Sequence, residues 1–287
     1  MAKDINIFKK RLGRTGFEIS VLGLGGHTYP VEDNGHSPQH HELRGRLIGH
    51  LISSGVNYFD TTWLHEVKLL SDSFKRADVK EQTFVSLQYV DGISDPNWPR
   101  KLRQEIEARL TIMDYTYAPL FLMGMGNRNI AYTEVLAACE AMAKLREEGL
   151  IQNLGISCHT INLFPLISQV IQETDLIDYI MIRFNLRFQQ ANEALFPIAK
   201  KHDVGIIIMK VFCWNCGPNE WDKPIGVFEP VPKEHRIVNN LSLTPAQQNL
   251  IWSVQNSPCD IVVVAMNSIW EVNQNINALH PMIQNSK

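Results

Sequence analysis

Short apolar runs alternate along the chain with longer segments in which apolar residues recur every three or four positions. The runs have the length of strands and are nearly continuous in Val, Ile, Leu, Phe and Met, which is typical of parallel strands buried on both faces. We predict strands in eight runs, which are residues 21–26, 58–62, 84–90, 118–125, 153–158, 179–185, 205–212 and 260–266.

The segments between these runs carry helical signals. Residues 43–55 place apolar side chains at three-to-four spacing and end on Gly55, a residue suited to the position after a helix. Residues 244–257 begin with Thr244 and Pro245, an N-cap followed by proline at the first helical position. The same periodicity predicts helices over 99–113, 131–149 and 192–205.

Eight strands with helices between them predict a (β/α)8 TIM barrel, an α/β fold that forms a single domain over residues 1–287. A doubly wound open sheet is the alternative. Its dinucleotide-binding version is disfavoured because no GxGxxG pattern follows the first predicted strand. Two long loops are expected at 27–41 and 213–241, after the first and seventh strands, on the face where barrels build their active sites.

Composition narrows the class of protein. The chain has 287 residues, of which 45% are hydrophobic and 20% charged, enough for a sizeable globular core. A net charge of −3 without a long basic run disfavours a nucleic-acid partner. No apolar stretch is long enough for a signal region or a membrane span. Five cysteines fit a reducing cytosol, so we expect a cytoplasmic protein.

Four pieces of the sequence together resemble the aldo/keto reductases. They are RLGRTGFEISVLGLGG at 11–26, GVNYFDTT at 55–62, GIS at 155–157 and AMNSIWEVNQN at 265–275. The resemblance implies a (β/α)8 barrel that binds a nicotinamide cofactor without a Rossmann motif. It also implies carbonyl reduction by four side chains, which are an Asp ending the second strand, a Tyr in the next loop, a Lys ending the third strand and a His ending the fourth.

Only one of these four side chains is retained at the matching positions. Asp60 stands at the Asp position. Counting forward places His65 at the Tyr position, whereas counting back from the following helix places Trp63 there, and both alternatives stay open. Gln88 stands at the Lys position and Gly124 at the His position. The usual chemistry of the family is therefore not expected in its usual form.

The replacements of the Tyr by His65 and of the Lys by neutral Gln88 would be chemically consistent with each other. A tyrosine, with a pKa near 10, needs an adjacent ammonium to act near neutrality, whereas a histidine titrates near 6.5 without that help. The sequence therefore predicts an acid–base dyad in which Asp60 orients His65 or raises its pKa. The alternative interpretation is a decayed site in which the loop histidine is solvated.

Other residues at strand ends complete the candidate site. Alternation places Met181, Arg183 and Asn185 on one face of their strand. Met181 matches a family glutamine that stacks against nicotinamide, and Arg183 is either an anchor for an anionic group or part of a salt bridge to the helix shell. His27 is either a second general base or a structural histidine. The candidate substrate contacts are Trp63, Gly124 and Arg183. At Gly124 we expect open volume for a bulkier substrate.

The resemblance also indicates residues for the cofactor. Gly25 and Gly26 match glycines that let the backbone approach the cofactor. Ser157 matches a serine at the carboxamide, and Asn275 matches an asparagine at the adenine. Lys210 is a phosphate or substrate contact, or a strand-end charge that reaches solvent.

The form of the cofactor follows from two other positions. Ala265 and Glu271 stand where NADPH-using members carry Lys and Arg for the 2′-phosphate. A glutamate repels a phosphate and can accept a hydrogen bond from a ribose hydroxyl, so NAD(H) is predicted over NADP(H). The alternative is that these polar residues face water at the start of a helix and no cofactor binds.

No metal site is expected. Cys213 and Cys216 form a CxxC motif without a second pair at zinc spacing. His36, His40 and His41 lie in a polar segment without an acidic partner at fixed spacing. The sequence stops about a dozen residues after the adenine-side asparagine, which predicts a shallow pocket or one completed by a neighbouring subunit of a homo-oligomer.

Three functions remain open. The first is an enzyme of aldo/keto reductase ancestry that uses NAD(H) on a small polar carbonyl- or hydroxyl-bearing substrate. The second is a non-redox acid–base enzyme that catalyses dehydration, isomerisation or cyclisation on the same barrel. The third is a catalytically inert homologue that senses a nucleotide. The first is favoured because several cofactor positions are kept.

Overall fold

The computed structural model describes residues 7–26, 38–79, 83–93, 95–126, 130–212 and 243–284. Within these ranges, eight parallel strands close into a barrel in the order β10-β3-β4-β5-β6-β7-β8-β9. The predicted (β/α)8 barrel is therefore confirmed. The barrel strands are β3 Leu22–Leu24, β4 Tyr58–Asp60, β5 Phe84–Tyr89, β6 Ala118–Gly124, β7 Ile151–Cys158, β8 Tyr179–Arg183, β9 Gly205–Met209 and β10 Ile261–Val264.

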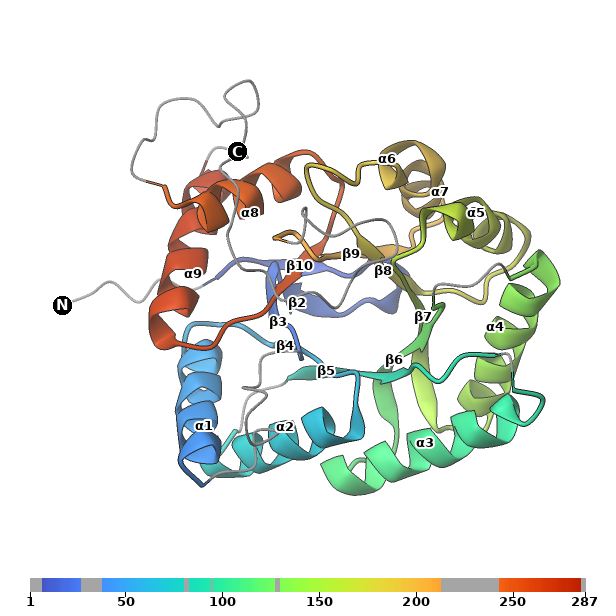
Figure 1. Cartoon of the computed structure of the whole chain (residues 1–287), viewed down its shortest axis with the longest axis horizontal. Helices are drawn as coiled ribbons and strands as arrows, with labels where there is room; N and C mark the ends of the chain where they lie inside the picture. The colour runs from blue at the N-terminus through green and yellow to red at the C-terminus, as the bar shows by residue number, and fades with distance from the viewer. Residues whose placement is uncertain are drawn as a thin grey trace.

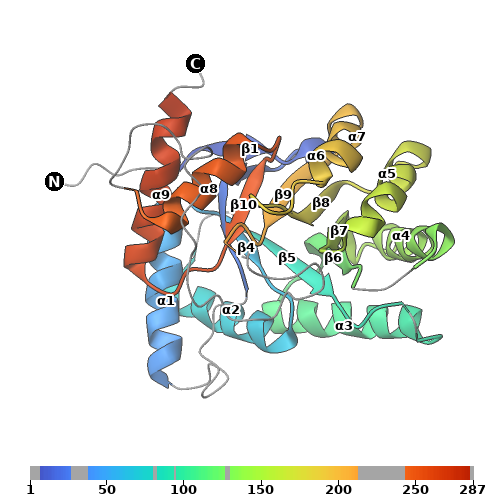
Figure 2. The same ribbon diagram turned by 45° about the horizontal axis from the view of Figure 1, so that its top comes forward.

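Helices surround the barrel as a ring when it is viewed along its axis (Figure 1). Helices α1 and α9 lie beside each other at one edge (Figures 1 and 2), where His50 Nε2 and Asn273 Oδ1 are 2.8 Å apart. The described helices are α1 Pro38–Ser53, α2 Leu64–Ala77, α3 Trp98–Met113, α4 Tyr132–Glu147, α5 Phe164–Glu173, α6 Ala191–Ala194, α7 Phe196–Lys201, α8 Pro245–Gln255 and α9 Ile269–Gln284.

Most predicted boundaries differ from the observed ones by a few residues, and two helices differ more clearly. Helix α1 begins at Pro38, so the last part of the expected loop at 27–41 belongs to the helix. Proline is well suited to a first helical position, which explains the earlier start. The single helix expected over 192–205 is divided into α6 and α7. The division follows from Pro197, because proline lacks the N–H that would continue the ladder of helical hydrogen bonds.

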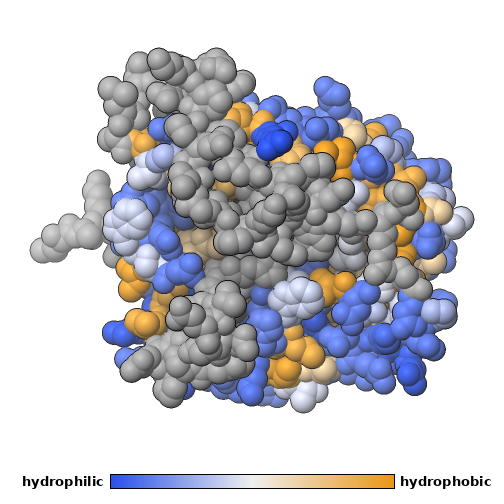
Figure 3. Space-filling view, in the orientation of Figure 1, coloured by the Kyte–Doolittle hydropathy of each residue, from blue (hydrophilic) through white to orange (hydrophobic). Residues whose placement is uncertain are grey.

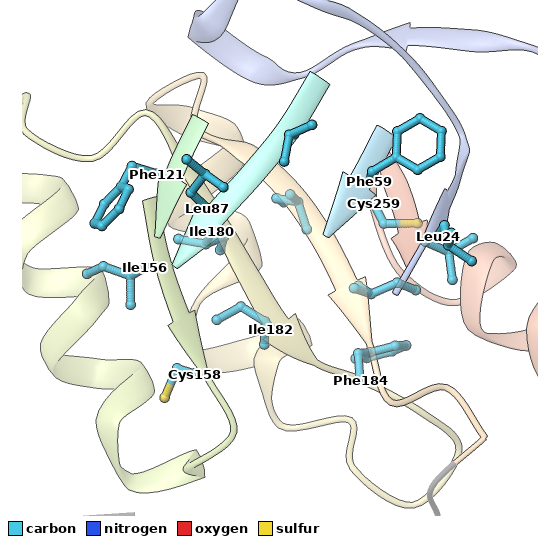
Figure 4. Close-up of a cluster of buried hydrophobic side chains, with 14 of the residues drawn as sticks. Leu24, Phe59, Leu87, Phe121, Ile156, Cys158, Ile180, Ile182, Phe184 and Cys259 are labelled. Atoms are coloured by element: carbon cyan, nitrogen blue, oxygen red, sulfur yellow. The ribbon is translucent and has the colours of Figure 1, made fainter. Parts of the chain in front are cut away.

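The main hydrophobic core lies between the strands and the helices. Alternate residues of each strand point outward into it, and Figure 4 shows Phe59 on β4, Phe121 on β6 and Ile156 on β7 in this position. Each of these side chains is at most 1% exposed. Full burial of an apolar side chain of this size contributes roughly 1.5–3 kcal/mol. This core fixes which residues of each strand remain to face the barrel interior.

Two tyrosine rings fill the lower part of the barrel interior. Tyr58 and Tyr179 are completely buried there, and the Tyr179 hydroxyl lies 3.3 Å from Ser86 Oγ. A Cβ on Gly23 would lie 2.5 Å from Tyr58 Cδ1, and one on Gly155 would lie 2.6 Å from Tyr179 Cζ. Glycine at these two strand positions therefore provides the space that the two rings occupy.

A hairpin that the sequence did not predict covers the N-terminal end of the barrel. Strands β1 Lys9–Arg11 and β2 Glu18–Ser20 pair antiparallel around the 3-10 turn η1 Gly13–Thr15. Leu12 is completely buried with the interior residues, and the Phe17 ring lies 4.5 Å from the Phe84 ring at the start of β5. The hairpin thus closes the end of the barrel opposite the strand C-termini.

The outer surface combines both kinds of residue. In Figure 3, hydrophilic side chains cover much of the edge at the lower right, where α3 lies in Figure 1, with smaller hydrophobic areas between them. In the part of the chain that the structure describes, no helix has the length and apolar character needed to cross a membrane.

Candidate active site

The C-terminal ends of the strands bring most of the predicted site residues together. Gly124, Ser157 and Met181 are in register on the adjacent strands β6, β7 and β8. Each belongs to the alternate set of positions that faces the interior, because the residues on either side of it pack in the outer core. Barrels of this class place their active sites at this end. The register therefore supports one site at the barrel mouth.

Asp60 is the last residue of β4 and pairs in register with Ser86 on β5. It lies two residues after Tyr58 and therefore points to the same, interior side. Burial raises the pKa of Tyr58 and of Tyr179 well above the usual value, and the charge of Asp60 raises both further. The carboxylate of Asp60 consequently lies above the two tyrosines, at the entrance to the barrel interior.

Gln88 and Gly124 are neighbours on β5 and β6. A Cβ on Gly124 would lie 3.0 Å from Gln88 Nε2, 3.0 Å from Tyr89 O and 3.3 Å from Val90 Cγ1. The expectation of open volume at Gly124 is therefore wrong, because the Gln88 side chain and the adjacent backbone fill the space. Gln88 is buried, so this part of the mouth is closed by an amide.

Glu66 is a residue of the site that the sequence analysis missed. Its Oε2 accepts hydrogen bonds from Thr62 N at 2.6 Å and Trp63 N at 3.1 Å. A Cβ on Gly26 would lie only 2.6 Å from the same oxygen, so Gly26 makes room for this carboxylate. Glu66 is 1% exposed and holds the loop that follows Asp60. The sequence gave little signal for it, because the N-cap residue is Trp63 and the Ser or Thr that usually precedes such a glutamate by three residues is missing.

Arg109, on α3, holds the same loop from the other side. Its Nη2 donates to Thr62 O at 3.0 Å, and its Nη1 donates to both Glu105 O and the Glu105 carboxylate. The guanidinium is buried, and the ion pair with Glu105 balances its charge. The loop between β4 and α2 is therefore fixed by an acid and a base that lie on different helices.

His65 and Trp63 both lie at the start of α2, where Trp63 is the N-cap residue and both side chains are exposed. They line a cavity of about 380 Å³, which we name the rim pocket and which is formed by residues 63–65, residues 89–91, Glu105 and Arg109. Among the described residues, Asp60 is not part of its lining. The Asp60–His65 dyad stays a prediction.

Arg183 faces the interior from the end of β8, as alternation predicts, and its side chain is completely buried. Its guanidinium carbon lies 3.6 Å from the centroid of the Phe188 ring. Asn185 shapes this part of the mouth, because its Nδ2 donates to Lys210 O at 2.8 Å and its Oδ1 accepts from Phe188 N at 3.1 Å. Lys210 itself has a left-handed backbone, with φ of 59°.

Several described residues fit a nicotinamide dinucleotide. Ser157 and Met181 present a hydroxyl and an apolar thioether side by side in the upper interior. A Cβ on Gly25 would meet its nearest neighbours at 3.4 Å, an ordinary contact, so the fold does not by itself require glycine there. Because Gly25 has no side chain, a ligand can approach the backbone closely at this position.

The residues predicted to meet the adenine end of the cofactor are less accessible to a ligand. Asn275 is 5% exposed, which leaves little of its amide for a ligand. Glu271 Oε2 accepts from Asn267 N at 2.5 Å and from Ser268 N at 3.1 Å, so it caps the N-terminus of its own helix α9. This capping role is common for an acid in the first turn of a helix, and it occupies the carboxylate predicted to meet a ribose hydroxyl.

In the described ranges, no three His, Cys, Asp or Glu side chains are grouped so that they could hold a metal ion. His41 Nδ1 lies 3.8 Å from an oxygen of Asp72. Burial raises the pKa of the Cys139 and Cys158 thiols to about 12, so both stay protonated. The predictions for His27, His36, the His40 side chain, Cys213 and Cys216 lie outside the described residues.

Comparisons with known proteins agree with this geometry. The model of the Aldo/keto reductase family matches residues 21–286. A probable aldo-keto reductase 1 from Glycine max is 22% identical, over 94% of this chain and 83% of that protein. A putative aldo-keto reductase from Pseudomonas aeruginosa has a TM-score of 0.70 at 18% identity, with 97% of both chains covered. An aldo-keto reductase from Klebsiella pneumoniae, in complex with NADPH, has a TM-score of 0.68 at 16% identity, covering 95% of this chain and 89% of that one.

Proposed function

The chain belongs to the aldo/keto reductase family, and we propose that it is an oxidoreductase of small polar carbonyl or hydroxyl compounds that uses a nicotinamide cofactor. The observation that carries the proposal is the register of Gly124, Ser157 and Met181 at the strand ends. It places a hydroxyl and an apolar surface together at the mouth of a barrel of this family. The free, buried thiols Cys139, Cys158 and Cys259 support a cytoplasmic setting.

In this proposal the cofactor supplies the hydride, and the residues of the chain bind and orient the reactants. Ser157 would offer its hydroxyl to the carboxamide, and Met181 would pack against the nicotinamide ring. The backbone at Gly25 permits close approach. Arg183 places a positive charge beside Phe188, where it can attract an anionic group of the cofactor or the substrate.

The proton of the reaction is assigned to the Asp60–His65 dyad. Asp60 faces the interior at the end of β4, and His65 follows in the first turn of α2. His65 also lines the rim pocket, so its part in the reaction must be tested separately from that of Asp60. The variants His65→Ala and Asp60→Asn do this. A dyad predicts that both variants lose most activity, whereas full activity of His65→Ala would remove the histidine from the reaction.

The choice of cofactor is a finer part of the proposal. Ala265 and Glu271 offer no cation for a 2′-phosphate, which supports NAD(H). The Klebsiella pneumoniae proteins in complex with NADPH and with NADP support the phosphorylated form instead. Both forms must therefore be titrated against the same preparation.

The test is a titration of the full chain with NADH and with NADPH, followed by nicotinamide fluorescence. We expect saturable binding of at least one form, roughly fivefold weaker in Ser157→Ala, because one hydrogen bond contributes about 1 kcal/mol. Ser86→Ala is the matched control, since Ser86 lies deeper on the interior side of β5. Absence of binding at millimolar cofactor would overturn the proposal.

A second function is supported by one specific observation. The Gln88 amide packs against Gly124. If these residues stand at the Lys and His positions of the family, as the resemblance implies, neither supplies the usual proton-transfer group. A non-redox acid–base reaction would use Asp60 without a nicotinamide. Turnover that depends on Asp60 but needs neither NADH nor NADPH would establish this alternative, and no turnover of any kind would favour an inert, nucleotide-sensing homologue.

A further inference from the structure

The rim pocket lies beside the barrel mouth and shares Trp63 and His65 with the candidate active site. It lies on the outer side of β5, between the first turn of α2 and the middle of α3, whereas Asp60, Gln88 and Ser157 face the interior. A volume of about 380 Å³ is within the range of small-molecule sites. The pocket is therefore large enough for a ligand of its own.

The charges of the rim pocket do not cancel. The Arg109 guanidinium is paired with Glu105 and also donates to backbone oxygens, so its positive charge is compensated within the wall. Asp91 is exposed, and no ion pair joins it to another residue of the described chain. Burial, and after it the charge of Asp91, raises the pKa of Tyr89 to about 12, so this phenol stays neutral. One acid therefore remains available in the pocket.

Part of the pocket lining is aromatic. Trp63 is 44% exposed and lines the pocket, and it is followed by Leu64 and His65. An indole face attracts an organic cation through its quadrupole, and the attraction adds to that of a nearby carboxylate. An exposed indole and an exposed carboxylate that forms no ion pair with another described residue are together complementary to a positive charge carried on an apolar body. The carboxylate of Asp91 does act on the charge of Lys101, but Lys101 is paired with Asp95.

We propose that the rim pocket binds a small organic cation, with its ammonium group near Asp91 and its apolar body against Trp63. This site does not depend on the oxidoreductase function. A ligand bound here would rest on the loop that Arg109 and Glu66 hold in place after Asp60.

The test uses three probes of similar shape with the full chain: 2-phenylethylamine, which is protonated at pH 7, neutral 2-phenylethanol and anionic 3-phenylpropionate. Affinities are measured by isothermal titration calorimetry. We expect the amine to bind roughly tenfold more tightly than the alcohol, and the carboxylate to bind more weakly than either. Added salt should weaken binding of the amine and leave binding of the alcohol unchanged.

Variants locate the site. Asp91→Asn should weaken amine binding roughly fivefold without changing alcohol binding, and Trp63→Ala should weaken both. Trp63→Phe keeps a ring and should give an intermediate affinity, which guards against a folding defect in the alanine variant. Glu147→Gln and Trp270→Ala are matched controls, because both residues are exposed on other helices.

Three results would overturn the proposal. The first is equal affinity for the amine and the alcohol. The second is an Asp91→Asn variant that binds the amine as the parent does. The third is an equal loss of amine binding in the Trp63 variants and in Trp270→Ala, which would place the cation elsewhere.

Discussion

The lower and upper parts of the barrel interior are built in opposite ways. The lower part is filled by two tyrosine rings, Tyr58 and Tyr179, that fit against glycines with almost no spare volume. The upper part contains Asp60, Gln88 and Arg183, which are polar or charged and gain little from burial. The lower part therefore stabilises the barrel, whereas the upper part contains the residues of the proposed active site.

The largest expected effect tests the packing of the lower part. Gly155→Ala would place a methyl 2.6 Å from Tyr179 Cζ and 2.7 Å from Leu122 Cδ2. We expect the free energy of unfolding to fall by about 2 to 3 kcal/mol, measured by urea denaturation, because a packed ring cannot move aside. Gly126→Ala, where nothing lies within 4 Å of the new methyl, is the control and should be nearly neutral. Equal effects of the two variants would contradict tight packing.

A pH dependence tests the same tyrosines. Their pKa values are raised in the folded protein, so above pH 10 the unfolded chain releases protons that the folded chain keeps. Stability is thus retained below pH 10 and lost above it, by about 1.4 kcal/mol per pH unit for each tyrosine. The double variant Tyr58→Phe/Tyr179→Phe should show a smaller loss between pH 10 and pH 11. Tyr117→Phe, at an exposed ring, should behave like the parent.

A third variant tests whether the loop at the upper part depends on its buried acid. Glu66→Gln weakens two charge-assisted hydrogen bonds, to Thr62 N and Trp63 N, and should lower the free energy of unfolding by about 1 kcal/mol. Glu134→Gln is a close match, because Glu134 caps α4 through Ala131 N at an exposed position. Its effect should be smaller, and thermal melts of both variants would show the difference. An equal effect would mean that burial adds nothing at Glu66.

The smallest expected effect has the opposite sign. Gln88→Met replaces a buried amide by an apolar side chain of similar length, so the free energy of unfolding should rise by about 0.5 to 1 kcal/mol. Urea denaturation measures the gain, and the activity of the same variant shows what the amide contributes to the site. A loss of stability would show that the upper part is packed for stability after all.

The barrel could be predicted from the sequence because its signal is local. Each strand is an apolar run such as GIIIM at β9, and the runs are separated by helical periodicity. The hairpin of β1 and β2 gave no such signal, since its strands have three residues each and one reads KKR. Contacts with residues far along the chain make it part of the fold, among them the packing of Phe17 against Phe84 and the ion pair of Arg11 with Asp203.

The residues of the candidate site also divide into those that the sequence could predict and those that it could not. Strand alternation placed Met181 and Arg183 correctly on one face of their strand, because a period of two needs no knowledge of the neighbouring strands. Ser157 was indicated by the family resemblance instead. The position of His65 and Trp63 could not be derived, since the loop before them is held by Arg109, 47 residues after Thr62. The volume at Gly124 was misjudged for the same reason, as it is set by a side chain on another strand.

The hairpin that covers the N-terminal end of the barrel leaves the strand C-termini as the side from which a ligand can reach the interior of the described barrel. Leu12 and Ile19 of the hairpin are completely buried with the interior residues, and the rings of Tyr58 and Tyr179 fill the lower interior. A nicotinamide cofactor and a substrate that bind as proposed would therefore share the upper interior and would enter and leave at the same side. Product-inhibition kinetics would show the order in which they do so.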